Sequence, residues 1–169
     1  MNSASDTRKR TLLAGVLAAG LFYGSKMALA HDHQAQSAIK NVVDFDVTTW
    51  AKLLKTGPRP AAYVFTNTFC ATCPEAFEVL QQAITASGKK AALAAVLMDA
   101  QGQQALAHAR HYVGATKLYA FDGFEPAIRQ TVDPKWHNIT PYIVLLSRSG
   151  TLQRVIGPPE AAQLKAWLA

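Results

Sequence analysis

The sequence lacks several features that mark well-known classes of protein. Only two of its 169 residues are cysteines, Cys70 and Cys73, which excludes a small scaffold held together by several disulfides. It has no internal repeat and no low-complexity block, so a solenoid or repeat array is also excluded. No basic run is interleaved with aromatic residues, and nothing in the chain therefore points to nucleic acid. The length suits one domain with a hydrophobic core of its own.

A long apolar run that could span a membrane is also missing, and the N-terminus instead resembles a secretory signal. Residues 8–10 are basic, residues 11–22 are mainly apolar, and residues 28–30 read Ala-Leu-Ala, a small-x-small cleavage site. Cleavage after Ala30 would make His31 the first residue of the mature chain. Because polar and glycine residues interrupt the apolar run before about 18 positions accumulate, an uncleaved membrane anchor is the less favoured alternative. The sequence thus predicts export to the periplasm.

Export would change the charge of the protein and leave one folded domain. The whole chain has a formal net charge of +6, whereas residues 31–169 contain thirteen basic and ten acidic residues, a net charge of +3. We expect residues 1–30 to be the signal peptide, residues 31–41 to be a flexible N-terminal segment, and residues 42–169 to form the domain.

The apolar pattern predicts strands that alternate with helices. Strands are expected at 42–47, 61–66, 91–98, 117–121, 141–147 and 151–156, and helices at 48–54, from the cysteines to 86, and at 101–112, 124–131 and 160–168. The continuous apolar runs at 61–66 and 91–98 indicate strands that are covered on both faces. Early strand–helix alternation followed by a hairpin and a last helix indicates an α/β sandwich with a mixed central sheet.

The two cysteines lie at the junction between an expected strand and an expected helix, in the spacing C-x-x-C. At the N-terminus of a helix, unpaired backbone N–H groups and the helix dipole favour a negative charge. Both therefore favour the thiolate, which is the nucleophilic form of cysteine. A disulfide that closes so short a loop restrains the unfolded chain only weakly. Redox or metal chemistry is thus a better explanation of the pair than structural cross-linking.

A proline stands where the penultimate strand is expected to begin. Pro141 follows Thr140, and a proline at a strand start has no N–H to offer the sheet. Two alternatives remain at this point: an ordinary trans proline at a strand edge, or a cis peptide bond that serves a tight local geometry.

Taken together, these features resemble the thioredoxin-fold superfamily over roughly residues 42–168. The C-x-x-C pair matches the redox-active centre of that family, and Thr140-Pro141 matches its cis-proline position. The run TPYIVLLSRSGTLQRVIG and the extra helix at 101–112 are similar to the exported TlpA/ResA-like branch. The resemblance implies a three-layer α/β sandwich, with a mixed central sheet flanked by helices, and the activity of an exported thiol–disulfide oxidoreductase.

The resemblance also implies roles for five residues. Cys70 would be the nucleophile and Cys73 the resolving cysteine, while Thr140, Pro141 and Phe69 would contact the substrate. The expected partners are periplasmic client proteins with thiols or disulfides, together with a membrane redox partner, and no cofactor is required.

The chain departs from the thioredoxin pattern at two positions near the cysteines. Val64 stands six residues before Cys70, where thioredoxin has a buried carboxylate, and Phe69 replaces a tryptophan. The direction of the reaction depends on differences of a few tens of millivolts, which sequence does not resolve. Reduction, oxidation and shuffling of disulfides therefore all remain open.

A second resemblance supports a different function. SCO-like copper chaperones share the fold and use two cysteines with a distant histidine, which here would be His137 beside Cys70 and Cys73. Thiolate and imidazole ligands suit copper. The predicted mature N-terminus, with His31 and His33, could also chelate Cu(II), although a solvated tail is the simpler interpretation. The alternative function is thus a periplasmic copper-binding chaperone.

Three further residues and a third function complete the predictions. His108 and His111 are spaced to share one face of a helix, which we interpret as a solvated or amphipathic surface. Trp136 suits either a core anchor or a substrate surface. A thioredoxin-like module that binds without catalysis is the third hypothesis.

Overall fold

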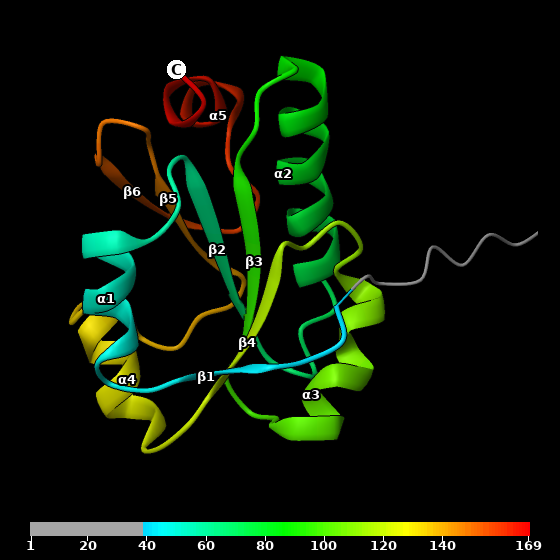
Figure 1. Ribbon diagram of the computed structural model, residues 1–169, viewed down its shortest axis with the longest axis vertical. Coiled ribbons are helices and arrows are strands. Elements are labelled where there is room, and N and C mark those ends of the chain that lie inside the picture. The colour runs from blue at the N-terminus through cyan, green and yellow to red at the C-terminus, as the bar shows by residue number, and fades with distance from the viewer. Residues whose placement is uncertain (1–38) are drawn as a thin grey trace, which may run out of the picture. The chain divides into compact units, whose positions relative to one another are not determined.

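The computed structural model describes residues 39–169, so the predicted signal peptide and most of the predicted flexible segment lie outside the described residues (Figure 1). The strands are β1 (Val43–Phe45), β2 (Ala61–Thr66), β3 (Ala92–Leu97), β4 (Lys117–Phe121), β5 (Tyr142–Leu146) and β6 (Leu152–Ile156). The helices are α1 (Thr49–Thr56), α2 (Cys73–Ser87), α3 (Gly102–His108), α4 (Glu125–Val132) and α5 (Ala161–Trp167), and the 3-10 turn η1 (Ala109–His111) follows α3. Within residues 39–169, none of these helices has the length and hydropathy needed to cross a membrane.

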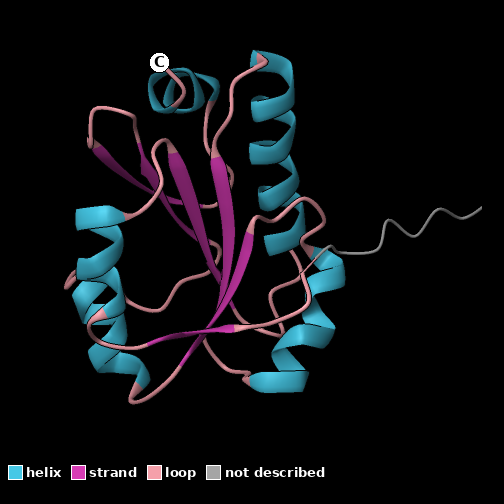
Figure 2. Ribbon diagram, in the orientation of Figure 1, coloured by secondary structure: helices cyan, strands magenta, loops and turns pink. Residues whose placement is uncertain are grey.

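The strands form one mixed sheet in the order β1-β4-β3-β2-β5-β6 (Figure 2). The pairs β1–β4, β4–β3 and β3–β2 are parallel, whereas β2–β5 and the hairpin β5–β6 are antiparallel. Strand β2 therefore lies at the change from parallel to antiparallel pairing. Its carboxyl end leads into the cysteines.

Alternation along the strands divides the core between the two faces of the sheet. Ala62 and Val64 of β2 pack with Phe77 of α2, in a cluster that also contains residues of α3 and α5. Phe65 of β2 and Trp50 of α1 belong to a second cluster, which α4 also enters. Figure 1 shows α1 and α4 on one side of the sheet and α2 and α3 on the other. The predicted three-layer α/β sandwich, with a mixed central sheet flanked by helices, is confirmed.

The first helix begins at Thr49, directly after Thr48, and the Thr48 side chain makes no capping hydrogen bond to the helix. The carboxylate of Asp46 instead accepts hydrogen bonds from the Thr48 N–H at 2.8 Å, the Thr48 hydroxyl at 2.7 Å and the Thr49 hydroxyl at 2.8 Å. These bonds favour the ionised carboxylate and lower the pKa of Asp46 to about 2.

We predict that Asp46→Asn destabilises the protein at pH 7. A lowered pKa in the folded state means that the carboxylate contributes stability above about pH 4, and that this contribution is lost as the pH falls towards 2. In urea denaturation, Asp46→Asn should therefore have a lower midpoint than the wild type at pH 7, and the two midpoints should converge near pH 2. The exposed Asp44 provides the control, because Asp44→Asn should change neither value. A pH-independent difference for Asp46→Asn would contradict this account.

Candidate functional site

The two cysteines form a disulfide in the loop that joins β2 to α2. Their Cα atoms are 5.5 Å apart. Cys73, the first residue of α2, has no exposed surface, whereas Cys70 in the preceding loop is partly exposed. An external thiol or disulfide can therefore approach the sulfur of Cys70 but not that of Cys73.

Backbone hydrogen bonds place Cys70 immediately before the start of the helix. The Cys70 N–H donates to the carbonyl of Asn67 at 3.3 Å, and the Cys73 N–H donates to the carbonyl of Cys70 at 3.4 Å. Pro74 follows within the first turn of α2, where a missing N–H leaves no helical bond unmade. The cysteine loop thus ends in a tight turn that brings Cys70 to the amino end of α2, as the sequence predicted.

A carboxylate on the neighbouring strand holds the beginning of the cysteine loop. Asp99, just beyond β3, accepts the Thr68 N–H with both oxygens, at 2.9 and 3.0 Å, and the Thr68 hydroxyl at 2.7 Å. Because β2 and β3 are parallel, their carboxyl ends meet at one edge of the sheet. Asp99 was not predicted from the sequence, although its position directly after an expected buried strand was a usable signal.

The side chain of Asn67 connects the cysteine loop to the proline turn. Its Oδ1 accepts the Phe69 N–H at 3.1 Å, and its Nδ2 donates to the Thr140 hydroxyl at 3.5 Å. The Thr140–Pro141 peptide bond is cis, and the Pro141 carbonyl accepts the Gly157 N–H at 3.0 Å. Asn67 therefore belongs to the site as the residue that joins its two loops, and the sequence analysis did not identify it.

Trp136 is a core anchor beneath the proline turn, one of the two roles that the sequence left open. It is 3% exposed and stacks on Tyr142 with ring centroids 4.2 Å apart. Its indole N–H donates to the carbonyl of Ile139 at 2.9 Å. The tryptophan thus fixes the backbone just before Thr140 and leaves no indole face for a substrate.

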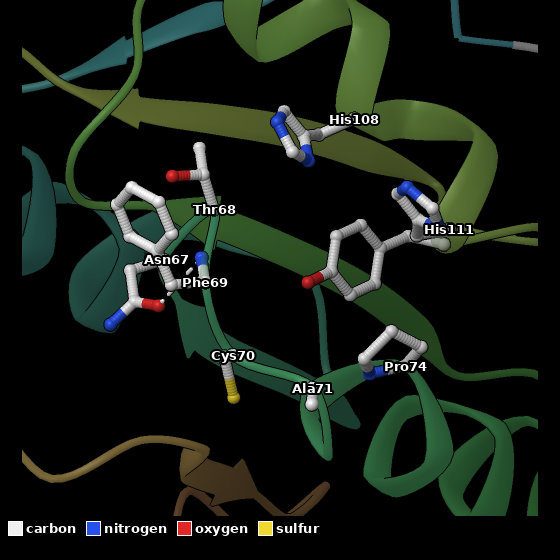
Figure 3. A pocket seen from close by; sticks show the side chains of 9 residues that line it. Asn67, Thr68, Phe69, Cys70, Ala71, Pro74, His108 and His111 are labelled. Carbon is white, nitrogen blue, oxygen red and sulfur yellow. Dashed lines mark hydrogen bonds between the residues drawn. The ribbon is translucent and has the colours of Figure 1, made fainter.

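An open hollow of about 300 Å³ lies beside the cysteine loop (Figure 3). It is lined by Asn67, Thr68, Phe69, Cys70, Ala71, Pro74, His108, His111 and Tyr112. In Figure 3 the two histidines lie across the hollow from the cysteine loop, and the Cys70 sulfur points away from them. The surface of His108 and His111, predicted to be solvated or amphipathic, thus forms one wall at the site.

Short-range contacts define the charge of that wall. The rings of His108 and His111 have centroids 5.7 Å apart, and Arg110 Nε donates to His111 Nε2 at 3.3 Å. Burial lowers the pKa of His111, and the charges of Arg110 and His108 lower it further. This imidazole therefore favours its neutral form.

A buried hydroxyl pair underlies the hollow. Thr66 is fully buried and its Oγ1 lies 2.8 Å from the hydroxyl of Tyr112, which packs edge-on against Phe77. The Thr66 hydroxyl is also placed to donate to the carbonyl of Asn67 at 3.2 Å, and either hydroxyl of the Thr66–Tyr112 pair can be the donor between them. Burial raises the pKa of Tyr112, the bond to Thr66 lowers it, and the charge of Asp99 raises it again. The result is a phenol that keeps its proton.

The structure gives no support to a copper site made by Cys70, Cys73 and His137. Within residues 39–169, no three histidine, cysteine or acidic side chains gather closely enough to hold a metal ion. His137 is exposed in the loop before the proline turn, and the two sulfurs are bonded to each other. His31 and His33 lie outside the described residues. Within residues 39–169 the copper alternative is therefore without support.

The position six residues before Cys70, where thioredoxin has a buried carboxylate, is fully apolar in this protein. Val64 has no exposed surface and belongs to the same core cluster as Ala76 and Phe77 of α2. The ionisable groups that the structure brings to the cysteine loop include Asp99, which binds Thr68, and His108, His111 and Tyr112, which line the hollow.

We predict that Asp99→Ala loosens the cysteine loop without unfolding the domain. Hydrogen bonds to an ionised carboxylate contribute about 1.5–3 kcal/mol, and partial exposure reduces that to roughly 1 kcal/mol here. Amide hydrogen exchange at Thr68 should therefore accelerate about fivefold. Asp122→Ala removes an exposed carboxylate that also follows a parallel strand, and it should leave the amide exchange rate of Thr68 unchanged. Equal exchange at Thr68 in both variants would show that Asp99 does not hold the loop.

Comparisons with known proteins yield only distant structural likenesses. No protein-family model matches the chain, and no curated protein matches its sequence. A secreted disulfide oxidoreductase of Mycobacterium tuberculosis, homologous to E. coli DsbE, is 18% identical with a TM-score of 0.45, covering 64% of this chain and 76% of that chain. StoA from Bacillus subtilis is 22% identical with a TM-score of 0.42, and the match covers 64% of this chain and 81% of StoA. The dsbF protein of Mycobacterium tuberculosis is 13% identical with a TM-score of 0.47, covering 65% and 81%. At this distance the likenesses describe the arrangement of strands and helices and assign no activity.

Proposed function

We propose that this protein is an exported thiol–disulfide oxidoreductase that exchanges disulfides with periplasmic client proteins. The observation that carries the proposal is the unequal exposure of a bonded C-x-x-C pair. Cys73 is fully buried at the start of α2, and Cys70 opens onto the hollow. A structural cross-link has no need of an accessible sulfur, whereas a redox centre requires one.

The proposed reaction moves two electrons between two sulfur pairs. In the reductive direction the Cys70 thiolate attacks one sulfur of a client disulfide, forming a mixed disulfide and releasing the other client sulfur as a thiolate, which takes up a proton. The Cys73 thiol then loses its proton and attacks Cys70. That step releases the second client thiol and leaves the Cys70–Cys73 disulfide. The reverse sequence oxidises a client dithiol, and the relative potentials of the two pairs determine the direction.

The side chains around Cys70 suit an extended, partly apolar client segment. Phe69 is 89% exposed beside the nucleophile, and Ile139 is 50% exposed just before the proline turn. Exposed large apolar residues that flank a reactive group favour a role in contact with a partner. We therefore assign client binding to Phe69 and to the partly exposed Thr140 of the proline turn, in which Pro141 itself is buried, and we assign no metal or other cofactor to the reaction.

The proposed location rests on the N-terminal sequence. Residues 1–30 have the basic, apolar and small-residue regions of a signal peptide. In the periplasm the dithiol would require a thiol or disulfide partner to restore its starting state after each turnover. A membrane protein that carries electrons across the inner membrane is the partner that fits this requirement.

We predict that Cys73→Ser traps client proteins and that Cys70→Ser does not. Without Cys73 the mixed disulfide on Cys70 has no internal thiol to resolve it, so it should accumulate. Expression in cells, followed by acid quenching, alkylation and non-reducing electrophoresis, would reveal bands that disappear on reduction. Cys70→Ser is the matched control, because its remaining thiol is buried. Absence of bands from both variants would favour the non-catalytic binding module instead.

We also predict that Phe69→Ala reduces kcat/KM for a protein client about tenfold. Burying a phenylalanine side chain against a partner contributes about 1.5–3 kcal/mol, and Phe69 is 89% exposed in the unbound protein. Reaction with dithiothreitol, which is too small to contact the ring, should be unchanged. Phe124→Ala is the matched control, since Phe124 is 74% exposed and does not line the hollow. An equal loss with dithiothreitol would mean that the variant alters Cys70 itself.

A further inference from the structure

Asn67 stands where the chain leaves β2, and both its backbone and its side chain bind parts of the site. Its carbonyl accepts the Cys70 N–H at 3.3 Å. Its side-chain Oδ1 accepts the Phe69 N–H at 3.1 Å, and its Nδ2 donates to the Thr140 hydroxyl at 3.5 Å. In Figure 3 the amide nitrogen of Asn67 and the sulfur of Cys70 both point away from the histidines. One half-buried residue thus contacts the backbone of the nucleophile and both residues that we assign to client binding.

The bond to the Phe69 N–H fixes the backbone from which an exposed ring projects. An asparagine that accepts the N–H two residues ahead forms an Asx turn, which determines the local path of the chain. Phe69 is 89% exposed, so packing against the core does not set the direction of its side chain. The preceding N–H, that of Thr68, is held by Asp99. The place at which the Phe69 side chain leaves the backbone therefore depends on the Asn67 amide and the Asp99 carboxylate.

The bond to Thr140 ties the cysteine loop to the proline turn. Within residues 39–169, no other hydrogen bond joins these two segments. The backbone of the turn is held from the other side, because Trp136 binds the carbonyl just before Thr140 and Gly157 binds the carbonyl just after it. At 3.5 Å the bond from Asn67 is long, so we expect it to order the loop rather than to stabilise the fold.

A fixed spacing between Phe69 and Thr140 matters to a client that contacts both. Each contact that must be ordered during binding costs conformational entropy, and ordering it beforehand removes that cost. A small disulfide that reaches only the Cys70 sulfur contacts neither residue and has no such cost. Loss of the Asn67 side chain should therefore weaken the reaction with an extended segment more than the reaction with a small disulfide.

We propose that Asn67 is a positioning residue, which fixes Phe69 relative to Thr140 and so gives Cys70 a preference for extended peptide segments over small disulfides. The inference rests on the proposed exchange reaction and assigns no chemical step to Asn67. An asparagine that only stabilised the loop would change the reaction with both kinds of substrate equally, because both react at the same sulfur.

Single-turnover kinetics of the full-length protein carrying Cys73→Ser tests this role. The probe is a pentapeptide whose central cysteine lies between valines and is bonded through its sulfur to nitrothiobenzoate. The Cys70 thiolate attacks the peptide sulfur, the peptide–nitrothiobenzoate bond breaks, and nitrothiobenzoate leaves as a coloured thiolate with the electron pair of that bond. The rate against peptide concentration gives a half-saturation concentration and a maximum rate. The symmetrical disulfide of nitrothiobenzoate, which has the same leaving group and no peptide, is the small substrate.

Asn67→Ala should raise the half-saturation concentration for the peptide about fivefold and lower the ratio of peptide to small-disulfide reactivity by a similar factor, since a neutral hydrogen bond and the order that it maintains are lost. In the Phe69→Ala background, Asn67→Ala should raise half-saturation by less than about twofold, because the ring that it positions is already gone and interacting residues are not additive. Asn67→Asp keeps an acceptor for the Phe69 N–H, and the Thr140 hydroxyl can donate to it, so half-saturation should stay within about twofold of the value with asparagine.

Asn138→Gly is the matched control. Asn138 is an exposed amide in the loop before the proline turn, and its φ of 60° is one that glycine adopts readily, so the variant should react with both substrates as before. An equal loss of rate with both substrates, or the full effect of Asn67→Ala in the Phe69→Ala background, would show that Asn67 only stabilises the loop. Release from the peptide no faster than by a free thiol would overturn the proposed function as well, whereas a saturable reaction that Asn67→Ala leaves unchanged would overturn only the role of Asn67.

Discussion

The pairing of β2 with a parallel strand on one side and an antiparallel strand on the other determines what surrounds Cys70. Thr66 at the end of β2 pairs with Leu97 of β3, and Phe65 pairs with Tyr142 of β5. The first pairing brings the carboxyl end of β3 to the cysteine loop, and with it Asp99. The second brings the amino end of β5, and with it the cis-proline turn. If β5 instead ran parallel to β2, its carboxyl end would lie beside the cysteine loop, and the cis-proline turn at its amino end would not.

The same pairing makes β2 fully buried, and this burial separates the two sulfurs. All six residues of β2 are buried, so the chain can reach the surface only after Thr66. Cys70 lies in the short exposed loop that follows, while Cys73 returns to the core with Ala76 and Phe77 on the buried face of α2. The unequal exposure of the cysteines therefore follows from the position of a fully buried strand immediately before a helix with one apolar face. The three positions from Cys70 to Cys73 are therefore enough to take the chain from the surface to the core.

Much of this arrangement could be predicted from the sequence, because local patterns encode it. The bounds of β2 and β4 were predicted without error, and β3 differed by one residue at each end. The C-x-x-C pair, the exposed Phe69 and the turn at Thr140-Pro141 also depend on local sequence.

The rest of the site depends on contacts between distant segments. The bonds of Asp99 to Thr68 and of Asn67 to Thr140 require the register of β3 and β5 against β2. The spacing of the two histidines in α3 and η1 indicated a shared face but not which surface that face would meet. At the start of α1, the charged oxygen of Asp46 accepts from the hydroxyls of both Thr48 and Thr49 and is a stronger acceptor than either hydroxyl.

The two ends of strand β2 are held in different ways. Its carboxyl end is held by charged and polar bonds to neighbouring loops, because the backbone there leaves the sheet and its donors need partners. At its amino end the backbone is fully paired, and space arises only from side-chain size, through the alanines of β3 opposite Tyr63 and Ala61. A change of side chain at the amino end alters volume without disturbing a backbone bond.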